Sequence, residues 1–115
     1  MSKPIVHHNP FYDLLRAEKI DEFNKQKAAG QEIGDQLCGG DYRGLDLRNL
    51  DADGLNLRDA YFRGADLRGI DFSNADIEFA SFCQSHISVC YFPKGLTAAE
   101  IRLSFDLGIR VRCRK

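Results

Sequence analysis

A five-residue period runs without a gap from residue 40 to residue 94, which gives eleven consecutive units. An amphipathic helix repeats its apolar positions every 3.6 residues or so and a half-buried strand every second residue, so neither explains this spacing. The third residue of every unit is apolar: Tyr42, Leu47, Ala52, Leu57, Phe62, Leu67, Phe72, Ile77, Phe82, Ile87 and Phe92. An apolar column of this period predicts a backbone that turns regularly and stacks on itself.

The other positions of the unit are also restricted. The first is mostly small or aliphatic. The second is Asp or Asn in seven of the eleven units, at Asp41, Asp46, Asp51, Asn56, Asp66, Asp71 and Asp76. The fifth is often a residue that suits tight turns, as at Gly44, Asn49, Gly54, Asp59, Gly64, Gly69 and Asn74. Each unit therefore predicts a short extended segment followed by a corner.

This pattern resembles the pentapeptide-repeat family, whose consensus is A(D/N)LXX. Residues 65–69 read ADLRG and residues 75–79 read ADIEF, and the resemblance covers residues 40–92, nearly half of the chain. In that family four units wind one square coil of a right-handed β-helix, with the first and third residues facing inward. The resemblance therefore implies an all-β solenoid, a right-handed quadrilateral β-helix of about 2.75 coils here.

Four units to a coil would place residues 20 apart above one another. The predicted inward columns are Tyr42/Phe62/Phe82, Leu47/Leu67/Ile87, Ala52/Phe72/Phe92 and Leu57/Ile77. No single unit can bury its inward residues alone, so we expect stacking of successive coils to form the core.

Both flanks of the repeats are predicted to cap the stack with α-helices. Asn9-Pro10 is typical of a helix start, and the apolar residues up to Gly30 are too irregular for one stripe, so we expect a break near residues 17–19. Thr97 and Glu100 form a capping box before a helix expected over 98–107, which Gly108 ends.

The closing sequence IRVRCRK fits either a strand or a frayed basic tail. We therefore expect one compact domain in three parts. These are an N-terminal helical cap over 1–39, the pentapeptide repeats over 40–93, and a C-terminal helix and basic tail over 94–115.

Composition is consistent with one small domain, since the 115 residues are 43% hydrophobic and 29% charged. No apolar run approaches the roughly 20 residues of a membrane span, and the N-terminus lacks the apolar core of a signal peptide. We therefore expect a cytoplasmic protein with no membrane partner. The net charge of -1 divides into -1 over 1–39, -4 over 40–92 and +4 over 93–115.

Residues for catalysis or metal binding are sparse. The four cysteines contain no CxxC pair, so a structural zinc site is not expected, and the thiols should be reduced. The spacing Cys83-x2-His86-x3-Cys90 loosely suggests metal ligands, but the repeat register points Cys90 inward and the other two outward. His7, His8 and His86 are interpreted as surface residues. Because a packed interior leaves no cleft, we expect no enzyme activity, no metal and no cofactor.

The predicted function is a non-enzymatic scaffold or protein–protein interaction module. Four apolar side chains break the polar rule for outward positions, namely Tyr61, Phe79, Val89 and Tyr91. Arginines at fourth positions form outward rows with the aspartates and add Arg43, Arg48, Arg63 and Arg68 to the candidate surface. The partner is another protein or a second copy of the chain, as a homodimer. Two alternatives stay open: the terminal helices cover the apolar residues, and the charges serve solubility only.

An alternative function is imitation of DNA. Some pentapeptide-repeat proteins confer quinolone resistance by mimicking duplex DNA and binding DNA gyrase. The predicted stack rises only about 13 Å at about 4.8 Å per coil, and duplex of that length carries on the order of eight negative charges. The repeats carry a net -4, so mimicry is the weaker hypothesis. Direct binding of nucleic acid by Arg110, Arg112, Arg114 and Lys115, together with Arg102 and Lys94, is also disfavoured, because no recognition helix or stacking platform accompanies them.

Overall fold

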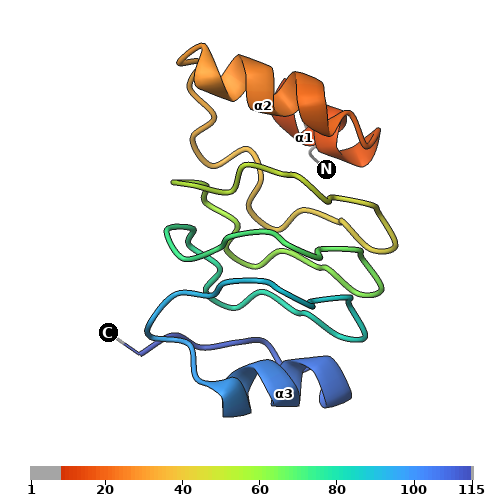
Figure 1. The fold of residues 1–115 in the computed structure, drawn as a ribbon, viewed down its shortest axis with the longest axis vertical. Helices are drawn as coiled ribbons and strands as arrows, with labels where there is room; N and C mark the ends of the chain where they lie inside the picture. Colours follow the sequence, from red (N-terminus) through yellow and green to blue (C-terminus); the bar gives the residue numbers. More distant parts are fainter. Residues whose placement is uncertain (1–8, 115) are drawn as a thin grey trace, which may run out of the picture.

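The computed structural model describes residues 9–114 and shows stacked coils of irregular backbone between helices at the two ends (Figure 1). Helices α1 (Pro10–Arg16) and α2 (Ile20–Ala28) lie over the first coil, and α3 (Ala98–Leu107) lies under the last. No helix in the described part of the chain is long and apolar enough to cross a membrane.

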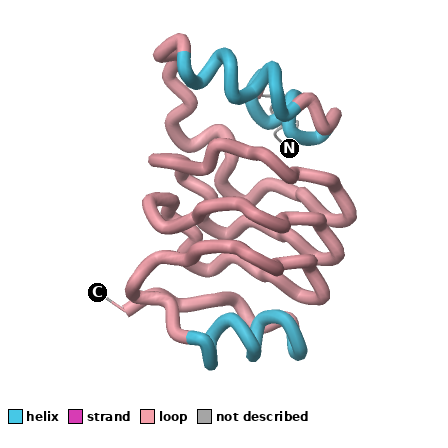
Figure 2. The backbone as a smooth tube through the Cα atoms, in the orientation of Figure 1, coloured by secondary structure: helices cyan, strands magenta, loops and turns pink. Residues whose placement is uncertain are grey.

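Successive coils pair through single parallel β-bridges between residues 20 apart. The bridges are Asp41↔Tyr61, Asp46↔Asp66, Asn56↔Asp76, Tyr61↔Ser81, Asp66↔His86 and Asp71↔Tyr91. The expected strands are thus reduced to one bridge per side, because a turn follows every two or three residues. Helices are the only extended regular elements between residues 9 and 114, as Figure 2 shows. We call the four segments of a coil sides 1 to 4 in chain order, so that side 2 comprises 45–49, 65–69 and 85–89.

The predicted inward register is confirmed. Third-position residues from Tyr42 to Phe82 are buried. The ring of Phe62 stacks between those of Tyr42 and Phe82, with centroids 5.4 and 5.2 Å away and planes 20° apart in both pairs. Ile87 and Phe92 lie in the last coil and are only half-buried, because no complete coil covers them. Residues 20 apart therefore do form the continuous core that the spacing predicts.

The second-position aspartates have a backbone role that explains their repetition. The Asp41 carboxylate accepts the N–H of the residue two positions on, at 3.2 Å, and the same contact recurs in later units. This Asx turn fixes the start of each corner. In most units the fifth position then adopts a left-handed backbone, usually at Gly, Asn or Asp, although Asn74 does not. Phe79 and Val89 are exceptions, with φ of 62° and 57°, and such a backbone is an outlier for bulky or β-branched residues.

The N-terminal cap has the predicted break. Helix α1 ends at Arg16 and α2 begins at Ile20. Asn9 occupies the N-cap position of α1, but its side chain makes no capping hydrogen bond. Phe11 and Phe23 are buried with their rings edge to face at 5.5 Å, which joins the two helices over the first coil.

The predicted C-terminal helix matches α3 in both bounds. The Thr97 hydroxyl accepts the Glu100 N–H at 3.2 Å, and Gly108 ends the helix with φ of 74°. Only half of the predicted capping box forms, because the Glu100 carboxylate instead accepts from Arg112. That contact ties α3 to the last residues of the chain.

The basic tail is neither a strand nor frayed. Residues 109–114 run back along side 4 and take the place of the missing fourth side of the last coil. The Phe79 N–H donates to the Val111 carbonyl at 2.8 Å, and the Arg114 N–H donates to the Gly95 carbonyl at 2.7 Å. Val111 is fully buried. The tail is therefore part of the cap.

Candidate interaction surfaces

The predicted arginine rows are largely neutralised by their own aspartates. Arg43, Arg48 and Arg68 each donate twice to the carboxylate two residues earlier, at 2.7–3.0 Å. The Arg43 guanidinium lowers the pKa of Asp41 to about 2, and the Arg68 guanidinium does the same for Asp66. Arg63, also predicted as part of the surface, has no ion pair within residues 9–114.

Tyr61 and Phe79 lie at the corner between sides 4 and 1, and both are partly covered. The Arg110 guanidinium lies over the Tyr61 ring, 5.2 Å from its centroid, and that of Arg58 lies 5.7 Å from the centroid of Phe79. Arg110 also pairs with Asp59 at 3.1 Å. Arginine side chains, one of them in the tail, thus cover part of both aromatic rings.

Val89 and Tyr91 lie at a different corner, between sides 2 and 3, and remain exposed. Their exposed fractions are 79% and 66%, against 39% for both Tyr61 and Phe79. The structure thus divides the four predicted apolar residues into two separate pairs. Only the second pair leaves apolar surface largely open.

The suggested Cys83, His86 and Cys90 spacing does not converge on a site. The Cys90 thiol lies 2.9 Å from the Leu67 carbonyl oxygen and donates to it, and burial raises its pKa. The described residues contain no cluster of three or more His, Cys, Asp or Glu side chains fit to hold a metal. His7 and His8 lie outside the described residues.

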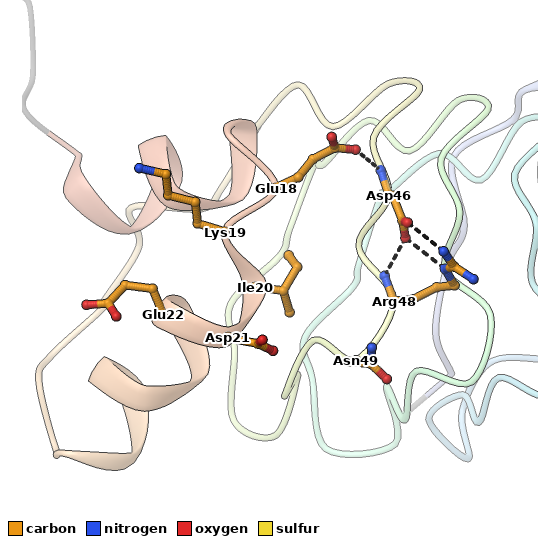
Figure 3. A pocket seen from close by; sticks show the side chains of 8 residues that line it. All are labelled: Glu18, Lys19, Ile20, Asp21, Glu22, Asp46, Arg48 and Asn49. Atoms are coloured by element: carbon orange, nitrogen blue, oxygen red, sulfur yellow. Dashed lines mark hydrogen bonds and ion pairs between the residues drawn. The ribbon is translucent and has the colours of Figure 1, made fainter.

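A polar hollow of about 680 Å³ lies between the α1–α2 turn and side 2 of the first coil. Its lining residues are Glu18, Lys19, Ile20, Asp21, Glu22, Asp46, Arg48 and Asn49. Figure 3 shows the Glu18 carboxylate directed at the Asp46 N–H and the Asp46 carboxylate directed at Arg48. These groups already bind one another, and no nucleophile lies beside a general base, so the hollow is a weak candidate for catalysis.

A second hollow, of about 640 Å³, separates α3 from side 2 of the last coil. It is lined by Ser85, His86, Ile87, Ser88, Phe92, Ala98, Ile101, Arg102, Phe105 and Asp106. We call it the α3 groove. Sequence reasoning missed it, because the groove exists only where α3 docks beside the coil, and the five-residue period carries no signal for that docking.

Comparison with protein-family models gives one decisive result. The model for pentapeptide repeats matches eight copies, over residues 36–69, 43–78 and 53–88. Residues 36–88 of this chain are therefore pentapeptide repeats. Comparisons with curated proteins and with solved structures give no match.

The pentapeptide-repeat match also extends the boundary set from the sequence. It begins before Gly40, and Leu37, in the preceding unit, is fully buried. The Gly39 N–H donates to the Arg58 carbonyl at 2.8 Å, as in the later units. The presence of pentapeptide repeats supports a non-catalytic repeat protein in general terms.

Proposed function

We propose that this chain is a non-enzymatic protein–protein interaction module, and that its stacked coils form a right-handed quadrilateral β-helix that serves as a rigid scaffold. The bridges between residues 20 apart and the stacked rings support the second part. Consecutive aromatic layers and paired side chains leave the coils little freedom to deform. A surface held in this way loses little conformational entropy on binding.

The observation that carries the proposal is the exposed corner of Val89 and Tyr91. Val89 adopts a left-handed backbone, which costs a β-branched residue on the order of 1–3 kcal/mol, and it is 79% exposed, so packing offsets little of that cost. Tyr is also a residue type enriched at protein interfaces. Strain and apolar exposure at one corner favour a role in recognition over a role in folding.

DNA mimicry is supported less well. The aspartates of side 2 form ion pairs with arginines in the same and the adjoining coil, including Arg48 with Asp66 at 3.4 Å. The surface of duplex DNA is negatively charged throughout, whereas negative and positive side chains alternate along side 2. Absence of an effect of micromolar protein on DNA supercoiling by gyrase agrees with the interaction module, and strong inhibition would favour mimicry.

Photo-crosslinking tests the proposed surface directly. A benzoylphenylalanine in place of Tyr91 is expected to give discrete adducts in cell lysate under ultraviolet light. The matched control carries the same group in place of Tyr61, which Arg110 covers. Equal adduct patterns from both positions, or none from position 91, would refute the assignment of this corner.

A further inference from the structure

Side 2 shows how each coil binds the one below it. The Ala65 carbonyl accepts the His86 N–H at 2.9 Å, and the His86 carbonyl accepts the Leu67 N–H at 2.9 Å. The Gly69 N–H donates to the Ser88 carbonyl at 3.1 Å. On side 2, the second coil thus presents downward one carbonyl and two N–H groups from its first, third and fifth residues.

The corresponding groups of the last coil are open. Among residues 9–114, no hydrogen-bond partner lies in reach of the Ser85 carbonyl or of the Ile87 and Val89 N–H groups. We call these three groups the side-2 edge. An unpaired edge of this kind is a template for pairing with another extended chain.

Two other sides at this end of the stack meet the C-terminal cap. On side 1, the Phe82 N–H donates to the Ser104 hydroxyl at 2.9 Å and the Gln84 N–H to the Phe105 carbonyl at 3.1 Å, both in α3. On side 4, residues 109–114 pair with the coil, as described above. The C-terminal cap therefore supplies hydrogen bonds to sides 1 and 4 and leaves side 2 unpaired. On side 3, the Cys90 carbonyl and the Phe92 N–H also have no hydrogen-bond partner among residues 9–114.

The opposite end of the stack shows that this opening is not general. There the N-terminal cap supplies a side-chain acceptor for the second-position N–H of three sides in turn. The Tyr12 hydroxyl accepts the Asp41 N–H at 3.1 Å, and the Asn24 side-chain oxygen accepts the Asp51 N–H at 2.9 Å. The Glu18 carboxylate accepts the Asp46 N–H. On side 2, therefore, the first coil is closed by Glu18 while the last coil is open.

The side-2 edge faces the α3 groove, which supplies the side-chain half of a binding site. Ile87 and Phe92 form its coil wall and Ile101 and Phe105 its helix wall, and all four are half-buried. A volume of about 640 Å³ lies within the range of about 300–1,000 Å³ that is usual for ligand pockets.

We propose that the side-2 edge and the α3 groove together bind an extended peptide segment of a partner protein, by addition of one strand-like segment to the last coil. The inference rests on the proposed function in that the chain must bind protein. One residue of the segment donates its N–H to the Ser85 carbonyl, and its own carbonyl accepts the Ile87 N–H. The carbonyl of the residue two positions further on accepts the Val89 N–H.

The register of the upper coils predicts the chemistry of the segment. The residue that pairs with Ser85 and Ile87 occupies a second position, so its side chain points outward below His86. Its two neighbours point inward, toward the apolar walls of the groove. The recognised segment therefore has apolar residues on both sides of a polar one, as in the Ala-Asp-Leu of this chain's own residues 65–67.

A peptide fits this opening better than a second copy of the whole stack. Helix α3 forms the outer wall of the groove, so the flat end of another coil cannot approach side 2. A single extended segment passes between the coil and the helix.

The test uses the peptide GADLRGI, which is residues 64–70 of this chain, with blocked termini. In the fold the same residues pair with side 2 of the first coil, where the Asp66 N–H donates to the Leu45 carbonyl at 2.8 Å. Titration of the isotope-labelled protein with millimolar peptide is expected to shift the amide resonances of Ile87 and Val89 saturably. Because these two amides have no hydrogen-bond partner in the free protein, they are expected to exchange fast with solvent there and more slowly in the complex.

Two substitutions in α3 supply the structural control. Ala98 lines the α3 groove, whereas the next residue, Ala99, lies outside it, and both are exposed. Ala98→Trp fills the groove and is expected to weaken peptide binding about tenfold or more, while Ala99→Trp leaves it unchanged. A peptide with Asp in place of its leucine is expected not to bind.

Three results would overturn the inference. They are the absence of saturable shifts at Ile87 and Val89, equal binding by the Ala98→Trp and Ala99→Trp variants, and protection of the same amides that rises with protein concentration alone. The last would assign the edge to a second copy. Discrete crosslinks from position 91 alongside any of these results would retain the proposed function and reject only the peptide site.

Discussion

Truncation of one stacked ring tests the core of this fold. Phe62 is fully buried, and its ring lies 5.4 Å from Tyr42, 5.2 Å from Phe82 and 6.2 Å from Phe72. Phe62→Ala removes all three contacts at once. Tyr61, its neighbour in sequence, is 39% exposed and contacts one guanidinium, so Tyr61→Ala is a matched control one residue away.

The expected costs differ several-fold. Loss of a fully buried phenylalanine costs about 3–5 kcal/mol of the free energy of unfolding, and the upper half of that range applies when the site cannot collapse. Here the Phe62 N–H donates to the Ser81 carbonyl at 2.9 Å, which holds the coils at their spacing around the cavity. Tyr61→Ala loses a cation–π contact and a partly buried ring, a cost of about 1 kcal/mol.

Urea denaturation followed by circular dichroism measures both variants. A common slope with denaturant would show that the midpoints report stability alone. Phe92 lies in the half-buried last layer, so the loss in free energy of unfolding for Phe92→Ala is expected to fall between those of Phe62→Ala and Tyr61→Ala. If Phe62→Ala and Tyr61→Ala differ by less than about 1 kcal/mol, the stacked-column account of the core is wrong.

Three further predictions concern the corners, the tail and the ion pairs. Val89→Asn places at this left-handed corner a residue type that tolerates the conformation, so it is expected to stabilise the protein by about 1 kcal/mol. Calorimetry should show this as a higher thermal midpoint. Gly95→Ala places a Cβ 1.9 Å from the Arg114 carbonyl oxygen, so it should lower the midpoint in the full chain but not in a chain that ends at residue 108. Asp41 and Asp66 have pKa values near 2 in the folded protein and about 3.9 when unfolded. Their contribution is therefore fully present above pH 4 or so and is lost as pH falls toward 2, which a thermal melt series at low pH measures.

The inward register was predictable because it follows directly from a short local repeat in the sequence. Every coil uses the same five-residue pattern, so one correct assignment fixes all positions from Tyr42 to Phe92. Helix α3 was equally local, since Thr97 and Gly108 mark its two ends. In both cases the residues that set the structure lie within a few positions of one another in the sequence.

The tail and the exposed surfaces were not predictable in the same way. Residues 109–114 alternate like a strand, but their hydrogen-bond partners at Phe79 and Gly95 belong to distant parts of the chain. Alternation alone cannot tell a paired strand from an irregular segment. The path of the tail also decides that Tyr61 is covered by Arg110 while Tyr91 is not, so the division of the predicted surface depends on the same long-range packing.

We expect recognition by this molecule to be concentrated where its internal pairing stops. Along side 2, Arg48 bridges Asp46 and Asp66 at 2.8 and 3.4 Å, so a charged partner must replace ion pairs that the protein already makes. Such exchange yields little net free energy at an exposed surface. At the side-2 edge, by contrast, a partner forms hydrogen bonds and apolar contacts that displace only water. Under the proposed peptide site, the repeats act mainly to hold the side-2 edge in a fixed shape.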